Sequence, residues 1–168
     1  MEQGFVKVAS ATPRIRVADP VYNAQVICEQ AKEAAEHGAK IVVFPELCIT
    51  GYTCNDLFLQ ELLLEKAKEA LLTIAEETGQ LETLFLVGLP VDKDGRLYNV
   101  AAVLYRGRIL GMIPKKNIPM YAEFYEGRHF TPGEETVTEY RLGKQVIPFG
   151  SNLLFRCEEL PELILGCE

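Results

Sequence analysis

The apolar run from Ile41 to Phe44 restricts the fold of this chain more than any other feature of its sequence. A strand that is apolar at every position is buried on both faces, as it is in sheets that helices cover. An amphipathic helix pattern precedes the run: Asp19 can cap its start, Pro20 fits the first turn, and Gly38 supplies a left-handed stop. Residues 20–44 therefore predict the helix and strand of an α/β fold.

The α/β pattern continues along the rest of the chain. Apolar residues with helical spacing predict a second helix from Asn55 or Asp56 to about Thr78, closed by Gly79. Between residues 114 and 133 the pattern is lost, which predicts an ordered loop with some helix. Apolar, β-branched runs separated by polar turns predict strands, two of them in a hairpin. The expected strands are residues 5–9, 41–44, 84–89, 97–105, 109–113, 145–148, 153–157 and 163–167.

The composition and charge of the chain limit its partners. Of its 168 residues, 48% are hydrophobic and 24% charged, which is typical of a globular protein and fits one domain over residues 1–168. The formal net charge of -7 disfavours duplex nucleic acid and anionic membranes. The start lacks the pattern of a secretion signal, and no apolar run approaches the roughly 20 residues that cross a bilayer. We therefore expect a cytoplasmic protein that binds neither nucleic acid nor membrane.

The cysteines indicate neither a disulfide framework nor a metal site. There are five, an odd number, and they are scattered along the chain. Cys48 and Cys54 lack the close spacing of zinc ligands, and only His37 and His129 could complete a ligand set. Reduced thiols and no bound metal are therefore expected.

Two charged residues directly follow predicted strands. Glu46 follows the run 41–44 after one proline, and Lys115 follows the strand 109–113 after another. Open α/β sheets place their ligand crevices at the carboxyl ends of strands, so both positions suit an active site. Taken alone, a solvated loop carboxylate and a surface lysine beside Lys116 are the simpler interpretation. The surrounding sequences favour the catalytic one.

These surrounding sequences resemble one family. Residues 44–52, Phe-Pro-Glu-Leu-Cys-Ile-Thr-Gly-Tyr, resemble the motif around the general-base glutamate of the nitrilase, or carbon-nitrogen hydrolase, superfamily. Residues 111–119, Gly-Met-Ile-Pro-Lys-Lys-Asn-Ile-Pro, resemble its lysine motif, in which Lys115 aligns with the catalytic lysine. Within the superfamily, residues 51–58 and 119–128 resemble the glutaminase domain of glutamine-dependent NAD synthetases. The resemblance covers essentially the whole chain.

The resemblance implies a fold, an activity and partners. The implied fold is the nitrilase-like α-β-β-α sandwich, here C-terminally incomplete. The implied activity is that of a glutamine amidohydrolase, which supplies ammonia to a ligase domain for ATP-dependent NAD synthesis. L-glutamine is the implied substrate, the synthetase domain or the remaining part of the same protein is the implied partner, and a homo-oligomer is expected. The glutaminase step needs no cofactor, while ATP and Mg are implied only for the absent synthetase domain.

The reaction of the family explains why these residue types are needed. A carboxylate takes the proton of a cysteine thiol, and the thiolate attacks the side-chain amide carbon of glutamine, which gives a thioester and ammonia. By the resemblance, Glu46 is the base and Lys115 stabilises the negative oxygen of the tetrahedral intermediate.

Four further residues carry implied binding roles. Either Glu123 or Glu126 is the second acid, which orients the lysine or the ammonium of the substrate. Tyr52 and Tyr121 line the substrate pocket. For both tyrosines, ordinary packing with a satisfied hydroxyl group is an equal alternative.

The chain departs from the family at its last residues. In the family the nucleophile lies four residues beyond a glycine, in a string like Gly-x-x-Ile-Cys-Glu-Asp. Here Gly166 is followed by Cys167 and Glu168, so the count places the nucleophile just after Glu168, with Cys167 as the alternative. Without the thiol no thioester forms, so we expect this polypeptide alone to be inactive. Uncovered sheet edges and apolar faces would also favour association.

Two other functions stay open on the sequence alone. One is a stand-alone amidase or ureidase of the same superfamily. The other is a catalytically dead nitrilase-like module that serves in assembly.

Overall fold

The structure is a computed structural model that describes residues 5–122 and 124–167. Seven strands form one mixed sheet in the order β1-β2-β3-β4-β5-β7-β6. Neighbours β1, β2 and β3 run parallel, and β3, β4 and β5 run antiparallel. The strands are β1 Val8–Ser10, β2 Ile41–Val43, β3 Leu84–Lys93, β4 Arg96–Tyr105, β5 Arg108–Pro114, β6 Thr138–Leu142 and β7 Gln145–Phe149.

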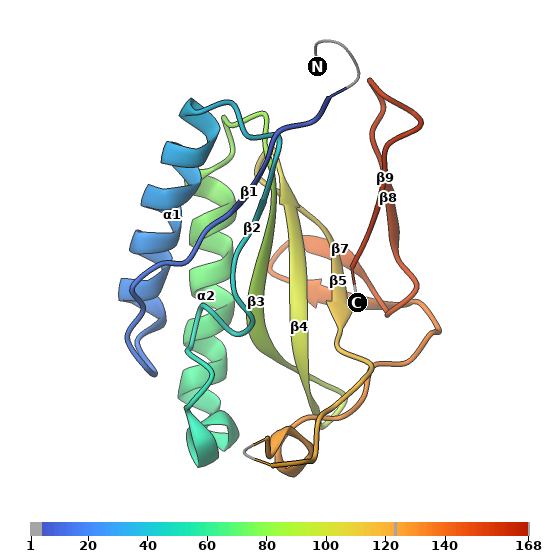
Figure 1. Ribbon diagram of the computed structural model, residues 1–168. Coiled ribbons are helices and arrows are strands. Elements are labelled where there is room, and N and C mark those ends of the chain that lie inside the picture. Colours follow the sequence, from blue (N-terminus) through green and yellow to red (C-terminus); the bar gives the residue numbers. More distant parts are fainter. Residues whose placement is uncertain (1–4, 123, 168) are drawn as a thin grey trace.

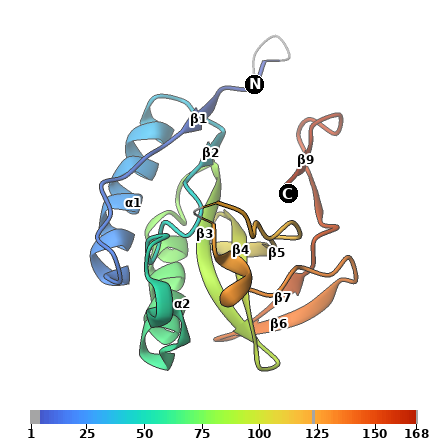
Figure 2. The ribbon, with the colours of Figure 1, turned by 60° about the horizontal axis from the view of Figure 1, so that its bottom comes forward.

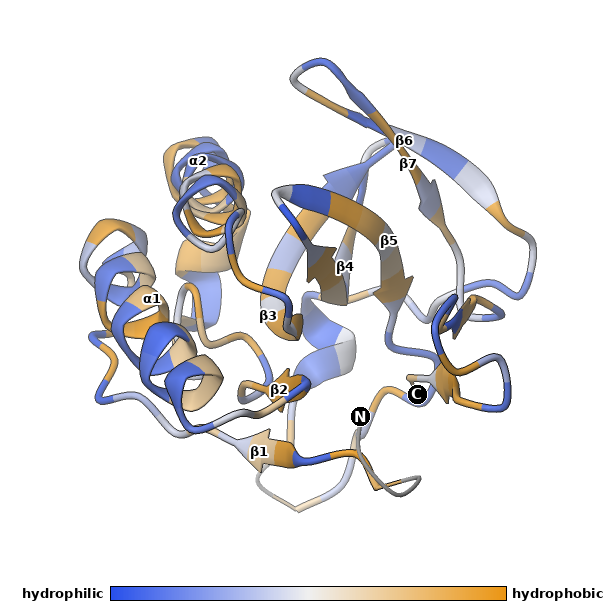
Figure 3. Cartoon of the chain, turned by 90° about the horizontal axis from the view of Figure 1, so that it is seen from above, coloured by the Kyte–Doolittle hydropathy of each residue, from blue (hydrophilic) through white to orange (hydrophobic). Residues whose placement is uncertain are grey.

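Two helices, α1 (Pro20–Glu36) and α2 (Glu61–Glu77), cover one face of this sheet (Figure 1). As predicted, the Asp19 side chain caps α1, where it accepts a hydrogen bond from the Tyr22 N–H at 3.1 Å. Seen from above, the apolar sides of both helices face the strands (Figure 3). The residues between the layers are fully buried, among them Ile27, Val42, Leu71, Ile74 and Phe85. This layer holds the carboxyl ends of β2 and β3 in fixed positions.

A short hairpin lies against the opposite face of the sheet. It consists of β8 (Leu154–Arg156) and β9 (Ile164–Gly166), which pair antiparallel (Figure 1). The partly buried side chains of Phe155 and Leu165 pack there against Leu86, Val103 and Ile113 of the sheet. Each face of the sheet therefore has its own apolar layer.

The second predicted helix is divided, which corrects the expectation of one helix from residue 55 to 78. A 3-10 helix, η1 (Asn55–Leu59), precedes α2, and Gln60 between them is extended with φ -88° and ψ 120°. The two pieces pack in different places: Phe58 contacts a cluster with Leu47 and Phe130, whereas α2 packs on the sheet. Helical spacing of apolar residues alone does not reveal that they face different clusters.

The other helices and strands differ from prediction mainly at their ends. The first strand is Val8–Ser10 instead of residues 5–9, and β6 was not predicted. The loop between β5 and β6 contains a 3-10 helix, η2 (Glu126–Arg128), as expected of that segment. In Figure 2 this orange loop lies beside the teal segment that carries η1. None of the described helices is long and apolar enough to cross a membrane.

Candidate active site

Glu46 lies in a loop of residues 44–60, the Glu46 loop, that leaves the carboxyl end of β2. The loop turns sharply: the N–H of Gly51 donates to the carbonyl of Leu47 at 2.7 Å, and Leu47 has a left-handed φ of 51°. Gly88 of β3 lets it pass close to the sheet, because a methyl group there would lie 2.4 Å from the backbone N of Leu47 and 2.8 Å from the carbonyl O of Pro45. The sheet therefore positions the backbone of Glu46 directly.

Most of the turn behind Glu46 is buried. The four residues that follow it, Leu47, Cys48, Ile49 and Thr50, are at most 1% exposed. The buried amide of Asn23 on α1 donates to the carbonyl of Ile49 at 2.9 Å, which satisfies a backbone acceptor that water cannot reach. Only the Glu46 side chain, 40% exposed, projects toward the sheet edge.

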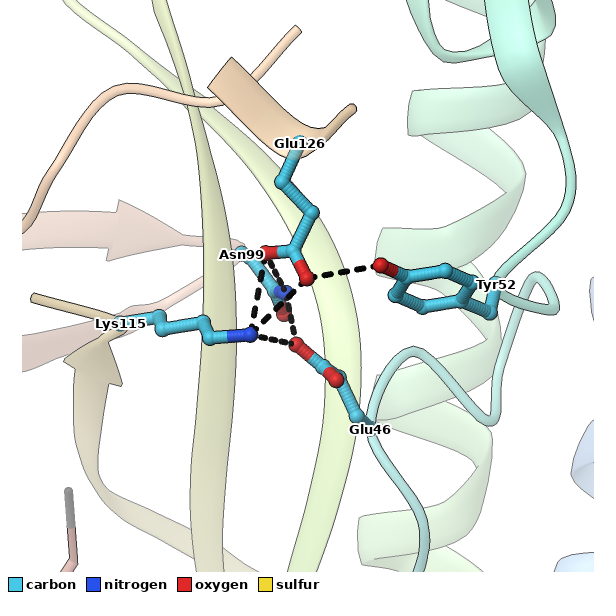
Figure 4. Close-up of polar contacts among 5 residues, drawn as sticks. All are labelled: Glu46, Tyr52, Asn99, Lys115 and Glu126. Carbon is cyan, nitrogen blue, oxygen red and sulfur yellow. Dashed lines mark hydrogen bonds and ion pairs between the residues drawn. The ribbon is translucent and has the colours of Figure 1, made fainter. Parts of the chain in front are cut away.

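Lys115 begins a second loop, the Lys115 loop of residues 115–133, directly after β5. Its N–H donates to the carbonyl of Asn99 at 2.7 Å, and its carbonyl accepts the N–H of Gly133 at 2.8 Å. The side chain reaches Glu46, with 2.7 Å between Nζ and Oε1 (Figure 4). Two segments that lie 69 residues apart in the chain thus meet through their charged side chains.

Glu126 on η2 completes the charged cluster. It is 5% exposed, and both of its carboxylate oxygens accept from Lys115 Nζ, at 2.9 and 3.0 Å. The hydroxyl group of Tyr52 donates to Oε1 of Glu126 at 2.9 Å (Figure 4). A buried amide, Asn99 Nδ2, donates to Oε1 of Glu46 at 2.5 Å and to Oε2 of Glu126 at 3.4 Å. All five side chains converge on one point of the sheet edge.

The electrostatics of the cluster keep Lys115 charged. Partial burial opposes the charge of the ammonium group, but hydrogen bonds and charge attraction from Glu46 and Glu126 outweigh it, so the pKa of Lys115 is raised. Two carboxylates around one ammonium group leave the cluster with an excess negative charge. Such a site can accept a proton at one carboxylate and hold a cationic donor at the same time.

A pocket of about 450 Å³ adjoins these side chains. Glu46, Asn99 and Lys115 form its polar wall, Gly88 and Ile113 contribute to the apolar one, and Cys167 also lines it. Burial raises the pKa of the Cys167 thiol. The pocket therefore combines a carboxylate, an ammonium group and a thiol that is not activated.

The remaining described cysteines do not line this pocket. Burial raises the pKa of Cys48 to about 12 and that of Cys28 to about 11, which is typical of inert core thiols. Across residues 5–122 and 124–167, no group of three or more His, Cys, Asp or Glu side chains is placed to hold a metal ion. The groups present suit acid-base and oxyanion chemistry.

The structure brings together Glu46, Tyr52, Lys115 and Glu126 of the residues singled out in the sequence. Tyr121 is not among them, since it is 69% exposed and its ring contacts that of Phe124, with 5.5 Å between centroids. Glu123 lies outside the described residues. Among the described residues of the Lys115 loop, Glu126 is the acid that contacts the lysine.

Asn99 is the site residue that sequence reasoning missed. It occupies a strand that was predicted only as an apolar run, in the string Leu-Tyr-Asn-Val-Ala-Ala-Val-Leu. A polar amide within such a run is the signal that could have revealed it, because a buried polar group needs partners.

Known proteins have sequences similar to that of this chain. A sequence model of the family described as Carbon-nitrogen hydrolase matches residues 7–153. The glutamine-dependent NAD(+) synthetase of Mycobacterium tuberculosis is 38% identical over 167 residues, which are 99% of this chain and 25% of that protein. The synthetase of the same name from Acinetobacter baylyi is 34% identical over 85% of this chain and 26% of that protein. This chain thus spans about a quarter of the length of these relatives.

Solved structures show the same fold. The crystal structure of a glutamine-dependent NAD(+) synthetase from Cytophaga hutchinsonii superposes with a TM-score of 0.85 at 28% identity, over 92% of this chain and 26% of that chain. An amidase from Nesterenkonia sp. superposes with a TM-score of 0.64 at 24% identity, over 85% of this chain and 54% of the amidase. The nitrilase-type α/β fold predicted from the sequence is therefore confirmed.

Proposed function

This chain belongs to the carbon-nitrogen hydrolase family, and from that premise we propose that it provides the base and the oxyanion stabiliser of a glutaminase site that supplies ammonia for NAD synthesis. Glutamine enters the proposal because the relatives that match nearly the whole chain are named glutamine-dependent NAD(+) synthetases. In this proposal, L-glutamine is the substrate, and an ATP- and Mg-using synthetase domain receives the ammonia.

One observation carries the proposal: Lys115 Nζ lies 2.7 Å from Glu46 Oε1 at the wall of a pocket. A carboxylate in this position takes the proton of a thiol, and the thiolate attacks the amide carbon of glutamine. The ammonium group of Lys115 stabilises the oxyanion that forms as the carbonyl becomes tetrahedral. When the C–N bond breaks, ammonia leaves and a thioester remains, and water then releases glutamate.

The thiol of this reaction is assigned from the resemblance to the family. A nucleophilic cysteine needs a lowered pKa from a nearby cation or base, whereas burial raises the pKa of Cys167. We therefore propose that Cys167 is a wall of the pocket and that the attacking thiol is the cysteine expected four residues after Gly166. Glu126 and Tyr52 hold Lys115 in place and leave its charge directed into the pocket.

Three further expectations belong to the proposal. The glutaminase step uses no cofactor, because a thiol, a carboxylate and an ammonium group suffice for it. We also propose a cytoplasmic location and a homo-oligomeric assembly. Chemical cross-linking of the purified protein tests the assembly.

A chimeric protein tests the function. This chain replaces the matching 167-residue segment of the Mycobacterium tuberculosis relative, and ammonia release from L-glutamine is measured. We expect activity in the chimera, a loss of about 10²- to 10⁴-fold with Glu46→Gln, and a loss of about 10²- to 10³-fold with Lys115→Met. Both variants remove chemistry while they keep the size of the side chain.

Lys116→Met is the matched control. Lys116 pairs with Glu135 and its side chain is 48% exposed, so the control removes an equal charge one residue from the site. Full activity of Glu46→Gln would refute the base role. An inactive chimera that still folds would instead favour the assembly module.

A further inference from the structure

The buried amide of Asn99 contacts both carboxylates of the site. Asn99 is 3% exposed, and its Nδ2 atom donates to Oε1 of Glu46 at 2.5 Å and to Oε2 of Glu126 at 3.4 Å (Figure 4). Its backbone carbonyl oxygen accepts the backbone N–H of Lys115 at 2.7 Å. One residue of β4 therefore joins both loops and both carboxylates.

The chemistry of an amide suits this place better than that of a charged group. Carboxylates only accept hydrogen bonds, so the NH₂ end of Asn99 must face them, and its two protons serve two acceptors. A second cation here would bind the carboxylates strongly and oppose the transfer of a proton to either. An aspartate would add a third negative charge to the cluster. Asparagine supplies two donors and no charge.

The contacts of Glu46 are unequal between its two oxygens. Oε1 accepts from both Asn99 and Lys115, at 2.5 and 2.7 Å. Oε2 has no hydrogen-bond partner in the part of the chain that the structure describes, and Figure 4 shows it turned away from Lys115. The carboxylate is thus fixed through one oxygen and open at the other.

Resting on the proposed function, we infer that Asn99 is a positioning residue, whose amide fixes Glu46 through Oε1 and reserves Oε2 as the oxygen that takes the proton of the thiol. Without the amide, Lys115 is the one remaining donor to Glu46 among the described residues. The carboxylate can then rotate about its terminal bond and offer both oxygens to the ammonium group. Such a rotation removes the free oxygen from the pocket.

The unfolding equilibrium of this chain tests the contact without reference to activity. The effect of Asn99→Ala is measured by urea unfolding in two backgrounds, the natural chain and Glu46→Gln. Hydrogen bonds to a charged acceptor are about twice as strong as neutral ones, so we expect Asn99→Ala to shift the unfolding equilibrium constant about fivefold more in the natural background. An equal shift in both backgrounds overturns the inference, because packing of Asn99 is the same in each.

Two further variants keep the test decisive. Asn99→Ser, which keeps one donor, replaces Asn99→Ala if the alanine variant does not fold. Glu82→Gln serves as the control background, because Glu82 pairs with Arg106 just beyond the other end of β4 and no contact joins it to Asn99. In the Glu82→Gln background, Asn99→Ala is expected to shift the unfolding equilibrium constant by the same factor as in the natural chain.

The kinetic consequence is measured in the chimera. Asn99→Ala is expected to lower kcat about 10- to 100-fold with little change in KM, and to move the acid limb of the pH profile to higher pH. Unchanged kcat and an unchanged acid limb contradict the positioning role. Failure of the proposed function gives a different result: the unmodified chimera releases no ammonia, while the difference between the two unfolding backgrounds remains.

Discussion

The Glu46 loop and the Lys115 loop meet at the same site but are held in different ways. Behind Glu46, four consecutive residues are at most 1% exposed, and the loop lies directly on Gly88 of the sheet. In the Lys115 loop, Met120, Tyr121 and Tyr125 are 61 to 69% exposed. The first loop is anchored in the core by the segment directly behind Glu46, while the second is attached to the core mainly at its two ends and through Glu126.

This difference assigns distinct tasks to the two loops. A base must keep one orientation, and a buried segment directly behind it provides this at no further cost in entropy. A loop with exposed apolar side chains opens locally with a small free energy and can respond to a ligand. We infer that the Glu46 loop sets the geometry of the site and that the Lys115 loop adapts to what enters it.

Glycine substitutions give the largest contrast between the loops. Gly88→Ala places a methyl group 2.4 Å from the backbone of Leu47, whereas in Gly127→Ala the three atoms nearest to the methyl group all belong to the flexible side chain of Met120. We expect Gly88→Ala to lower the free energy of unfolding by about 3 kcal/mol and Gly127→Ala by less than about 1 kcal/mol. Urea unfolding followed by circular dichroism measures both.

A third glycine shows where the Lys115 loop is tightly packed. A methyl group at Gly133 would lie 2.4 Å from the carbonyl O of Pro114. Gly133→Ala should therefore lower the free energy of unfolding nearly as much as Gly88→Ala does. If Gly88→Ala and Gly127→Ala both lower the free energy of unfolding by the same small amount, the Glu46 loop moves as freely as the Lys115 loop.

Removal of the shared cation has the next largest expected effect. Lys115→Met leaves the buried carboxylate of Glu126 without its ammonium partner, and we expect a loss of about 2 kcal/mol in the free energy of unfolding at pH 7. Because the pKa of Lys115 is raised in the folded protein, its contribution is complete below the ordinary lysine value of 10.5 and is lost as the pH rises through the raised value. The difference in free energy of unfolding between the natural chain and Lys115→Met should therefore shrink only above about pH 10.5.

Urea unfolding at pH 8, 9.5 and 11 measures this dependence. Lys116→Met removes one partner of an exposed ion pair, and it should lower the free energy of unfolding by less than about 1 kcal/mol at pH 8. A Lys115 contribution that already disappears between pH 8 and 9.5 would mean that the carboxylates do not hold the ammonium group.

The sequence predicts the segment up to Glu46 better than it predicts the contacts of the Lys115 loop. The helix from Pro20, the strand at Ile41 and the position of Glu46 follow from local patterns, since a cap, an apolar run and a proline act over a few residues. The division of the second helix at Gln60 does not, because it depends on Phe58 packing with Phe130, more than 70 residues away in the chain. Local periodicity carries no information on such a contact.

The partners of Lys115 show the same limit. Resemblance indicates an acid at either Glu123 or Glu126, and Glu126 contacts Lys115 in the part of the loop that the structure describes. Nothing in the spacing of the loop predicts this contact, since it depends on the turn of η2 that carries Glu126. Asn99 was missed for a related reason: its role depends on pairing between β4, β5 and the Glu46 loop.

The two tyrosines give the smallest effect and the sharpest test of adaptation. Tyr52 donates to Glu126 at 2.9 Å, while the hydroxyl group of Tyr121 has no hydrogen bond to any other described residue. Tyr52→Phe should therefore lower the free energy of unfolding by about 1 kcal/mol, and Tyr121→Phe should change it by less than about 0.5 kcal/mol. In the chimera, the prediction that Tyr121 lines the substrate pocket requires Tyr121→Ala to raise KM for glutamine, although that residue is exposed in the free protein. If KM stays constant, the Lys115 loop does not close over the substrate through Tyr121, and that tyrosine is a surface residue.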